Sequence, residues 1–262
     1  MRERMNQALI IAEEMADRHK ISLSLVIEDL QSAERVSLKE DLVHSSASTI
    51  KIPLMLAVME EEGRAFTFSD VIELTDEQAV DFSVVTQIGE RRYSVLEYLQ
   101  WMMLESCNAS TNVLIDLVGY DRVNRIFDDL EMKETRLRRK MMDMEARKKG
   151  VDNTTSAQDM AILLQKMYKK EYFSASTCSM GLSLMKRCRD KKLLKRFIPQ
   201  ELPFAHKSGG LDEVSHDAGI FFGNNNLLVC AFSTSKKGTR NTLLREQTIG
   251  HIGRCLFKER RV

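Results

Sequence analysis

The sequence contains no apolar run that approaches the roughly 18 residues a membrane-spanning helix needs. Its 39 basic and 38 acidic residues nearly cancel, so no excess of charge points to nucleic acid or an anionic membrane as a partner. Proline occurs only three times and no linker is evident, so the regions of the chain should share an interface. These absences favour a globular protein without a nucleic-acid or membrane partner, and they leave its oligomeric state open.

Cysteine is also scarce. The cysteines are odd in number and scattered, which does not suggest a disulfide framework, and none has the Cys/His spacing of a zinc site: Cys107, Cys178, Cys188, Cys230 and Cys255. Glu13, Glu14 and Asp17 interrupt the apolar stretch near the N-terminus, which fits an amphipathic surface helix rather than a signal peptide. We therefore expect a cytoplasmic protein with reduced thiols, no metal and no cofactor.

The order of predicted elements is α/β at both ends of the chain and helical between them. β-branched and apolar runs predict strands at 21–29, 33–38, 204–210, 215–223 and 226–236. From Ser48 to about Met185 apolar residues recur mostly at helical spacing, a last helix follows at 241–257, and the charge-rich stretch 138–155 predicts a long loop. An α/β domain of 1–45 and 186–262, with an inserted all-helical domain of 46–185, fits this order.

The first candidate site is Ser48 with Lys51, at the start of a stretch that is apolar on nearly every side. Such a stretch predicts a buried helix with Ser48 at its N-terminus and Lys51 one turn on, on the same face. Burial would lower the pKa of Lys51, so that its neutral amine could act as a base for the hydroxyl. Ser-x-x-Lys should occur about once by chance in a chain this long, and serine is a favoured N-cap, so a plain helix cap is the alternative.

Two further stretches could belong to the same site. Ser106 and Asn108 lie between two helical patterns, where a hydroxyl and an amide could face one cleft; an ordinary helix–helix turn is the alternative. In the predicted strand at 204–210, Gly209 and Gly210 would let a backbone or a substrate approach closely; an ordinary strand end is the alternative. The three stretches in this order are much rarer by chance than any one of them.

The trio resembles the signature of the class A β-lactamases and penicillin-binding proteins: Ser-x-x-Lys, Ser-x-Asn and Lys-Ser/Thr-Gly. The resemblance runs from about Ile21 to the last helix. It includes SCNASTNVLID, similar to the family's Ser-Asp-Asn-x-x-x-Asn-Leu-Leu stretch, and ETRLRR and NTTSAQDM, similar to the flanks of its omega loop. It implies a β-lactamase/transpeptidase-like fold: a mostly antiparallel sheet flanked by the terminal helices, an inserted helical domain, and an active site in the cleft between them.

The resemblance also implies a role for each catalytic residue. Ser48 would be the acylated nucleophile, and Lys51 its base or proton relay. Ser106 would pass the proton to the leaving nitrogen, and Asn108 would hold the lysine and the substrate amide. The backbone N–H groups of Ser48 and Gly210 would form the oxyanion hole.

Substrate binding is implied in the same way. Lys207 and Ser208 would bind a substrate carboxylate, so the expected partner is a small molecule that carries one. Many relatives add an arginine on the next strand; here His216 is the nearest candidate, and it would make that contact dependent on pH. The alternative is that His216 pairs structurally with Asp217.

The sequence departs from the family in the omega loop, where class A β-lactamases carry a glutamate that holds the water for hydrolysis of the acyl-enzyme. With Leu137 and Arg139 as register marks, Met141 takes that position, and a thioether cannot act as a base. Asp143 and Glu145 lie nearby and could substitute; alternatively, they only offset the surrounding basic charges.

Three hypotheses follow. The first is a serine hydrolase acylated at Ser48 by β-lactams, or by a related amide or ester, with slow or altered deacylation. The second is a D-Ala-D-Ala carboxypeptidase, amidase or esterase that acts on a small cytosolic compound. The third is a β-lactam-binding sensor without turnover, which Met141 motivates together with Cys107, because a thiol replaces the aspartate usual in the second motif.

Overall fold

A five-stranded sheet organises the fold in the computed structural model, which describes residues 1–236, 239 and 241–257. The strand order is β2-β1-β9-β8-β7, and every neighbouring pair is antiparallel. The strands are β1 (Ile21–Asp29), β2 (Arg35–Leu38), β7 (Phe204–Leu211), β8 (Val214–Phe221) and β9 (Leu227–Ser235). The two ends of the chain thus build one antiparallel sheet, and the predicted fold class is confirmed.

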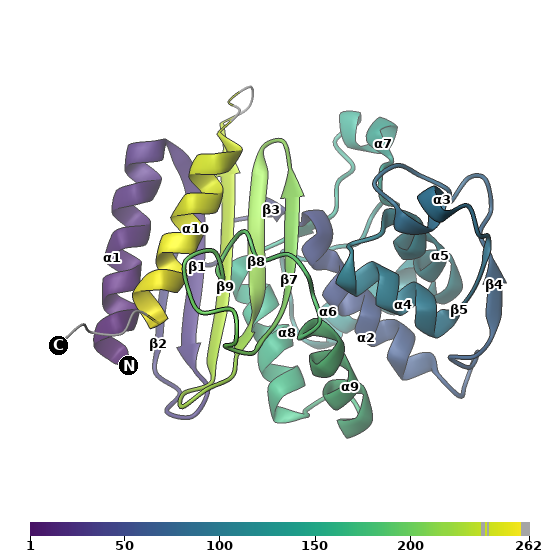
Figure 1. Cartoon of the computed structure of the whole chain (residues 1–262), viewed down its shortest axis with the longest axis horizontal. Helices are drawn as coiled ribbons and strands as arrows, with labels where there is room; N and C mark the ends of the chain where they lie inside the picture. The colour runs from purple at the N-terminus through teal and green to yellow at the C-terminus, as the bar shows by residue number, and fades with distance from the viewer. Residues whose placement is uncertain (237–238, 240, 258–262) are drawn as a thin grey trace.

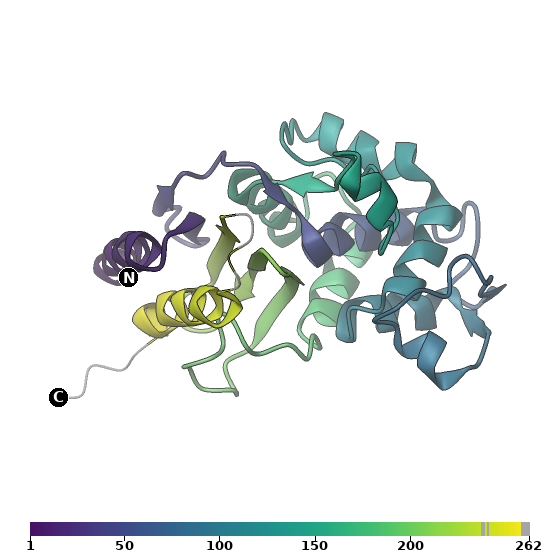
Figure 2. The same ribbon diagram turned by 90° about the horizontal axis from the view of Figure 1, so that it is seen from above.

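The terminal helices α1 (Arg2–His19) and α10 (Thr242–Phe257) pack side by side on one face of this sheet (Figure 1). Side chains along β1 alternate between two hydrophobic clusters: Leu25 and Ile27 join the terminal helices, whereas Val26 joins the helical region. This alternation is the period of a strand buried on both faces. Figure 2 accordingly shows α10 and α8 on opposite sides of the sheet.

Most of the helical region lies beyond β7, the edge strand of the sheet, whereas α8 packs against the face of the sheet opposite α10 (Figures 1 and 2). Its helices are α2 (Lys51–Glu61), α3 (Val84–Ile88), α4 (Val95–Leu104), α5 (Asn108–Val118), α6 (Tyr120–Asp129), α7 (Met144–Lys148), α8 (Ala157–Lys169) and α9 (Ala175–Met185). Every residue of α2 from Lys51 to Met59 is buried, which confirms the prediction of a buried helix. A 3-10 helix, η1 (Ala47–Ile50), precedes α2 and carries Ser48.

One hydrophobic cluster joins this helical region to the sheet, with members on α2, α8, β8 and β9. Among the described residues, one core therefore extends across the predicted boundary between the two domains. The domain boundaries themselves stay a prediction. Within the described part of the chain, no helix combines the length and the apolar character needed to cross a bilayer.

The stretch 138–155, predicted as a long loop, contains the short helix α7 and ends in β6 (Thr154–Thr155). That strand pairs with β3 (His44–Ser45), directly before the turn that carries Ser48. A second two-stranded ribbon, of β4 (Val71–Glu73) and β5 (Arg92–Ser94), lies at the far side of the helical region (Figure 1). The pairing of β3 with β6 fixes the end of the loop beside the candidate nucleophile.

Candidate active site

The three candidate stretches meet at one cavity of about 610 Å³. The predicted residues that line it are Ser48, Ser106, Asn108, Ser208, Gly209 and Gly210. Lys51 and Lys207 belong to the same stretches and are buried, with 0% and 1% of their surface exposed. A cavity of this volume suits a small-molecule ligand.

Ser48 lies on η1 and caps no helix. The cap position is Ser46, whose side chain makes no cap hydrogen bond, and Ser48 is half-buried and lines the cavity. Ala47 before it has a φ of 44°, a left-handed conformation that costs a non-glycine residue about 1–3 kcal/mol. The plain helix-cap interpretation is therefore wrong, because this strained turn presents Ser48 to the cavity.

Lys51 connects the first stretch to the second. Its Nζ donates to the Ser106 carbonyl oxygen at 2.7 Å, to Ser106 Oγ at 3.1 Å and to Asn108 Oδ1 at 3.0 Å. Burial holds the pKa of Lys51 well below its ordinary value, and the nearby charge of Lys207 lowers it further. The amine is thus bonded to the residues expected to share its chemistry. The lowered pKa favours its neutral form, which keeps only two N–H donors, so that the Ser106 hydroxyl would then donate to Nζ.

Backbone strain is concentrated around this cavity. Ser106 has a φ of 56°, and this conformation allows both its carbonyl and its hydroxyl to accept from Lys51. Four non-glycine residues with positive φ line the cavity: Ala47, Phe82, Ser106 and Met142. Such conformations persist only where the surroundings impose them, and they cluster at functional sites.

Gly209 on β7 allows the sheet edge to pass directly beside the nucleophile turn. A Cβ there would lie 3.0 Å from Ser48 N and 3.2 Å from both Ala47 Cβ and Ser46 O. The close approach predicted from the glycines of this strand is therefore real, and the partner is the backbone of η1.

Ser208 has a partner that the sequence did not suggest. Its hydroxyl donates to Asp190 Oδ2 at 2.7 Å, and Asp190 also lines the cavity. Lys207 Nζ donates to the Ser208 carbonyl oxygen at 2.8 Å. The Ser208 hydroxyl was expected to bind a substrate carboxylate, but in this structure it already donates to the Asp190 carboxylate.

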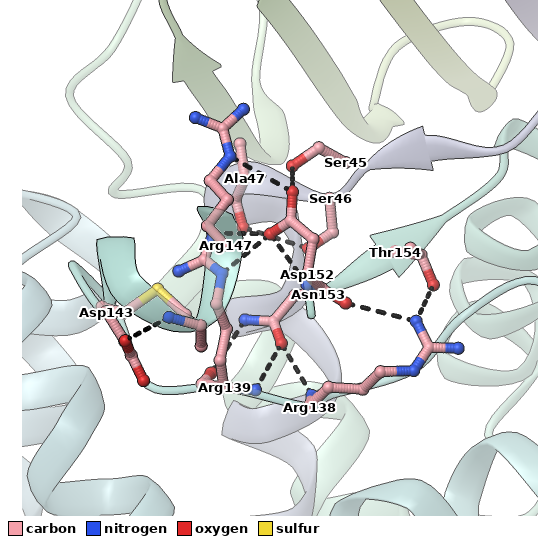
Figure 3. Close-up of polar contacts among 12 residues, drawn as sticks. Ser45, Ser46, Ala47, Arg138, Arg139, Asp143, Arg147, Asp152, Asn153 and Thr154 are labelled. Atoms are coloured by element: carbon pink, nitrogen blue, oxygen red, sulfur yellow. Dashed lines mark hydrogen bonds and ion pairs between the residues drawn. The ribbon is translucent and has the colours of Figure 1, made fainter. Parts of the chain in front are cut away.

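The loop over the cavity is held by Asp152 (Figure 3). Arg139 donates to Asp152 Oδ1 from Nε at 2.8 Å and from a terminal nitrogen at 2.6 Å, while Ser45 Oγ donates to Oδ2 at 2.7 Å. Arg147 Nε approaches the same oxygen at 3.4 Å. Burial alone would raise the pKa of Asp152, but the Ser45 hydroxyl and the two guanidinium groups outweigh it and lower that pKa.

Met141 lies in the cavity wall, at the position expected for the deacylating base. Asn112 fixes its backbone: Met141 N donates to Asn112 Oδ1 at 2.7 Å, and Asn112 Nδ2 donates to Met141 O at 3.2 Å. The side chain is 7% exposed and lines the cavity. A thioether therefore occupies this part of the wall.

The expected role of His216 is contradicted. His216 has no exposed surface and does not line the cavity; its Nε2 bonds to Ser45 O at 2.8 Å, and its Nδ1 accepts from Ser233 N at 3.2 Å. It lies opposite Gly209 in the β7–β8 pair, so it packs under η1. Burial lowers its pKa to about 3. The alternative was also wrong, because Asp217 pairs with His206, whose Nδ1 lies 2.7 Å from Asp217 Oδ1.

Glu145 and Asp143 do not reach the cavity either. Glu145 is exposed on α7 and pairs with Lys148 at 2.7 Å. Asp143 is the N-cap of α7 and accepts from Ala146 N at 2.9 Å. Glu145 thus offsets a neighbouring basic charge, as the alternative held, whereas Asp143 caps the short helix, and neither carboxylate lines the cavity.

Two cavity residues, Asp190 and Phe82, did not figure in the sequence analysis, and Asn112, which lies within the quoted stretch SCNASTNVLID, was given no role there. Asp190 and Phe82 line the cavity, and Phe82 is 78% exposed. Asn112 stands four residues after Asn108, one helical turn on, which is the spacing that could have marked it. Among the described residues no group of three or more His, Cys, Asp or Glu side chains could hold a metal ion, and Cys107, Cys178, Cys188 and Cys230 are not in disulfides.

Comparison with known proteins gives a consistent result. A family model described as "Beta-lactamase enzyme family" matches residues 7–259. A β-lactamase from Sphaerobacter thermophilus is 24% identical, covers 95% of this chain and 94% of its own, and superposes with a TM-score of 0.84. No curated protein matches the sequence significantly.

Two further solved structures have the same fold. One from Chitinophaga pinensis, titled a β-lactamase, is 22% identical, covers 96% of this chain and 98% of its own, and has a TM-score of 0.87. A leucine-to-glutamate mutant of PBP-A, solved as an acyl-enzyme complex with penicillin G, is 24% identical, covers 96% and 95%, and has a TM-score of 0.86.

Proposed function

Because the chain belongs to the β-lactamase enzyme family and is a β-lactamase-like serine hydrolase, we propose that β-lactams, or related amides and esters, acylate Ser48 and that the acyl group is released slowly. One observation carries the proposal: the buried Lys51 amine bonds to Ser106 and Asn108 at the cavity that Ser48 lines. A nucleophile, a base with a lowered pKa and a second hydroxyl are the groups that acyl transfer needs.

In the acylation step, Ser48 Oγ forms a bond to the substrate carbonyl carbon, and the bond from that carbon to nitrogen or oxygen breaks. The proton of Ser48 moves to neutral Lys51, and a proton passes through Ser106 to the leaving atom. The bond between Lys51 Nζ and Ser106 Oγ supports this relay. The N–H groups of Ser48 and Gly210 would hold the developing oxyanion.

The partner we propose is a small molecule that carries a carboxylate. Lys207 supplies a buried positive charge behind β7, and burial in a low-dielectric wall strengthens its attraction for an anion. Ser208 donates to Asp190 in this arrangement, so Lys207 is the group that we expect to attract the carboxylate.

Release of the acyl group from Ser48 is the reaction step that we expect to be slow. Met141 occupies the wall in which a base would hold the hydrolytic water, and a thioether can neither take nor donate a proton. The PBP-A variant solved as an acyl-enzyme complex with penicillin G is a protein of the same fold that forms an acyl-enzyme with a β-lactam. The same methionine favours a second candidate function, a cytoplasmic β-lactam-binding sensor without turnover.

Intact-protein mass spectrometry with penicillin G tests the acylation. We expect the wild-type protein to gain the mass of one penicillin and to keep it for many minutes, whereas Ser48→Ala gains none. No gain on the wild type, or an equal gain on Ser48→Ala, would overturn the proposal.

A substrate panel separates the candidate activities. Nitrocefin reports β-lactam turnover, D-Ala-D-Ala peptides report carboxypeptidase activity, and p-nitrophenyl esters report esterase activity. Steady turnover of any of these that disappears in Lys51→Ala would exclude the sensor, whereas a stoichiometric burst without turnover would support it.

A further inference from the structure

A second cavity, of about 430 Å³, adjoins the one that Ser48 lines. Three residues line both cavities and form the wall between them: Met144, Arg147 and Val214. The second cavity therefore adjoins the site of the proposed acylation.

An ion pair closes this wall. Arg147 on α7 donates to Glu213 Oε2 at 3.2 Å, and Glu213 stands in the short turn between β7 and β8. The bridge thus runs from the loop over the cavity to the sheet edge. Its side chains are 24% and 35% exposed, so water and salt reach the pair, and such a pair contributes little stability and opens readily.

The polar groups that line the second cavity are already engaged within the protein. Both ring nitrogens of His44 are bonded, to Ser24 and to Thr234, and Ser45 Oγ donates to Asp152. Lys148 also lines this cavity; it is exposed and pairs with Glu145. The large side chains without a polar partner are apolar: Val43 is 48% exposed and Met144 is 43% exposed. These surfaces fit an aliphatic or aromatic chain rather than a polar group.

We propose that the second cavity binds the distal end of the substrate's acyl substituent, and that the Arg147–Glu213 ion pair is the gate that decides how long this substituent can be. With the pair closed, the acyl group must fit the first cavity. With the pair open, an apolar chain extends past Met144 into the second cavity. This inference rests on the proposed acylation of Ser48.

Two p-nitrophenyl esters with the same leaving group, the acetate and the octanoate, test the gate. The measured quantity is the ratio of their Ser48-dependent acylation rates, octanoate over acetate, with Ser48→Ala as the background. We expect Glu213→Ala to raise this ratio about three- to fivefold, the factor that corresponds to about 1 kcal/mol for an exposed ion pair. Glu213 is the better partner to remove, because Arg147 also contacts Asp152.

Two controls sharpen the test. Glu61→Ala breaks a similarly exposed pair, Arg122 with Glu61, that lines neither cavity, and it should leave the ratio unchanged. At about 1 M salt, which screens exposed pairs, the wild-type ratio should rise toward that of Glu213→Ala, whereas the variant's ratio should not change. If Glu213→Ala fails to fold, Glu213→Gln and the salt series on the wild type give the same readout.

The outcomes are distinguishable. Absence of Ser48-dependent acylation by both esters would contradict the proposed function. Acylation by both esters, with a ratio that Glu213→Ala and salt leave unchanged or lower, would overturn the gate alone. A ratio that rises equally in Glu61→Ala would also overturn it, because the effect would then be general loosening.

Discussion

Lys51 depends on its surroundings more than any other residue of the site. It is fully buried, its three bonds all go to Ser106 and Asn108, and burial together with Lys207 favours its neutral form. A neutral buried amine is a useful base, whereas a charged one would need a counter-ion.

Replacement of this amine should abolish the relay. Lys51→Met removes the base and keeps the length of the side chain, so acylation by penicillin G should fall by about 100-fold or more. Intact-mass time courses measure it, with Lys166→Met on the exposed face of α8 as the control. In the wild type the rate should rise with pH and level off well below pH 10.5, the ordinary lysine value. A plateau only near 10.5 would contradict the role.

Met141 offers the complementary gain of function. Met141→Glu places a carboxylate in the cavity wall, where it could hold and deprotonate water, and the penicilloyl-enzyme should then decay at least about tenfold faster. The decay of the adduct mass reports this rate. Val151→Glu adds the same charge to the same loop but outside the cavity, and it should not accelerate the decay; equal acceleration by both would show that charge alone is responsible.

Asp190 should oppose carboxylate ligands. Asp190→Asn removes a negative charge from the cavity and weakens the hold on the Ser208 hydroxyl, so the apparent affinity for penicillin G should rise about three- to tenfold. The acylation rate by p-nitrophenyl acetate, which carries no carboxylate, is the internal control and should stay the same. A parallel change with both compounds would indicate a general distortion of the site.

At the scale of elements, the site depends on how closely β7 passes the nucleophile turn. Gly209 has no room for a side chain, because a Cβ would meet Ser48 N at 3.0 Å. Gly209→Ala should push strand and turn apart by a few tenths of an ångström, misplace the oxyanion N–H groups and slow acylation about tenfold. Gly223→Ala, whose Cβ would lie 3.5 Å from Leu202 Cδ1, is the control. Equal rates for wild type and Gly209→Ala would refute this account.

The five strands of the main sheet, the terminal helices and the buried helix could be predicted from the sequence, because each carries a strong period, whereas the short strands β3 to β6 could not. The runs around Leu25 and Ile220 are long and β-branched or apolar, and the stretch after Lys51 is apolar on all sides, so strands and buried helix were predicted within a few residues. The signature stretches likewise identified the residues that meet at the cavity.

The partners of those residues could not be predicted, because they depend on contacts between distant segments. His216 faces η1 only because β8 pairs with β7 in a register that sets it opposite Gly209. Asp190 reaches Ser208 from an irregular segment without a period. Whether Glu145 faced the cavity depended on α7, a helix of one turn whose orientation no pattern encodes.

For the molecule as a whole, the strand that carries Lys207 and Ser208 is anchored by a buried pair behind the site. His206 and Asp217 are 2% and 1% exposed, and Asp217 also accepts from Leu194 N at 3.2 Å. Burial by itself would lower the pKa of His206 from 6.5, but the charge and hydrogen bond of Asp217, with Cys188 beside the ring, raise it to about 10. A raised pKa in the folded state makes protonated His206 a stabilising group.

The effect of His206 on the free energy of unfolding therefore depends on pH. The contribution of His206 should be fully present below about pH 6.5, where the unfolded chain is also protonated, and should be lost as the pH rises toward 10. The thiol of Cys188 titrates in the opposite sense, since its pKa is lowered to about 7: burial would raise it, and the His206 hydrogen bond outweighs burial.

The contribution of His206 is therefore best measured without that thiol, by comparing Cys188→Ala with the double variant Cys188→Ala/His206→Gln. The difference in their free energies of unfolding, from urea titrations at several pH values, should shrink between pH 6.5 and 10 by up to about 1.4 kcal/mol per pH unit. A difference that stays constant over this range would mean that His206 is neutral in the folded protein and that the pair is held by its hydrogen bond alone.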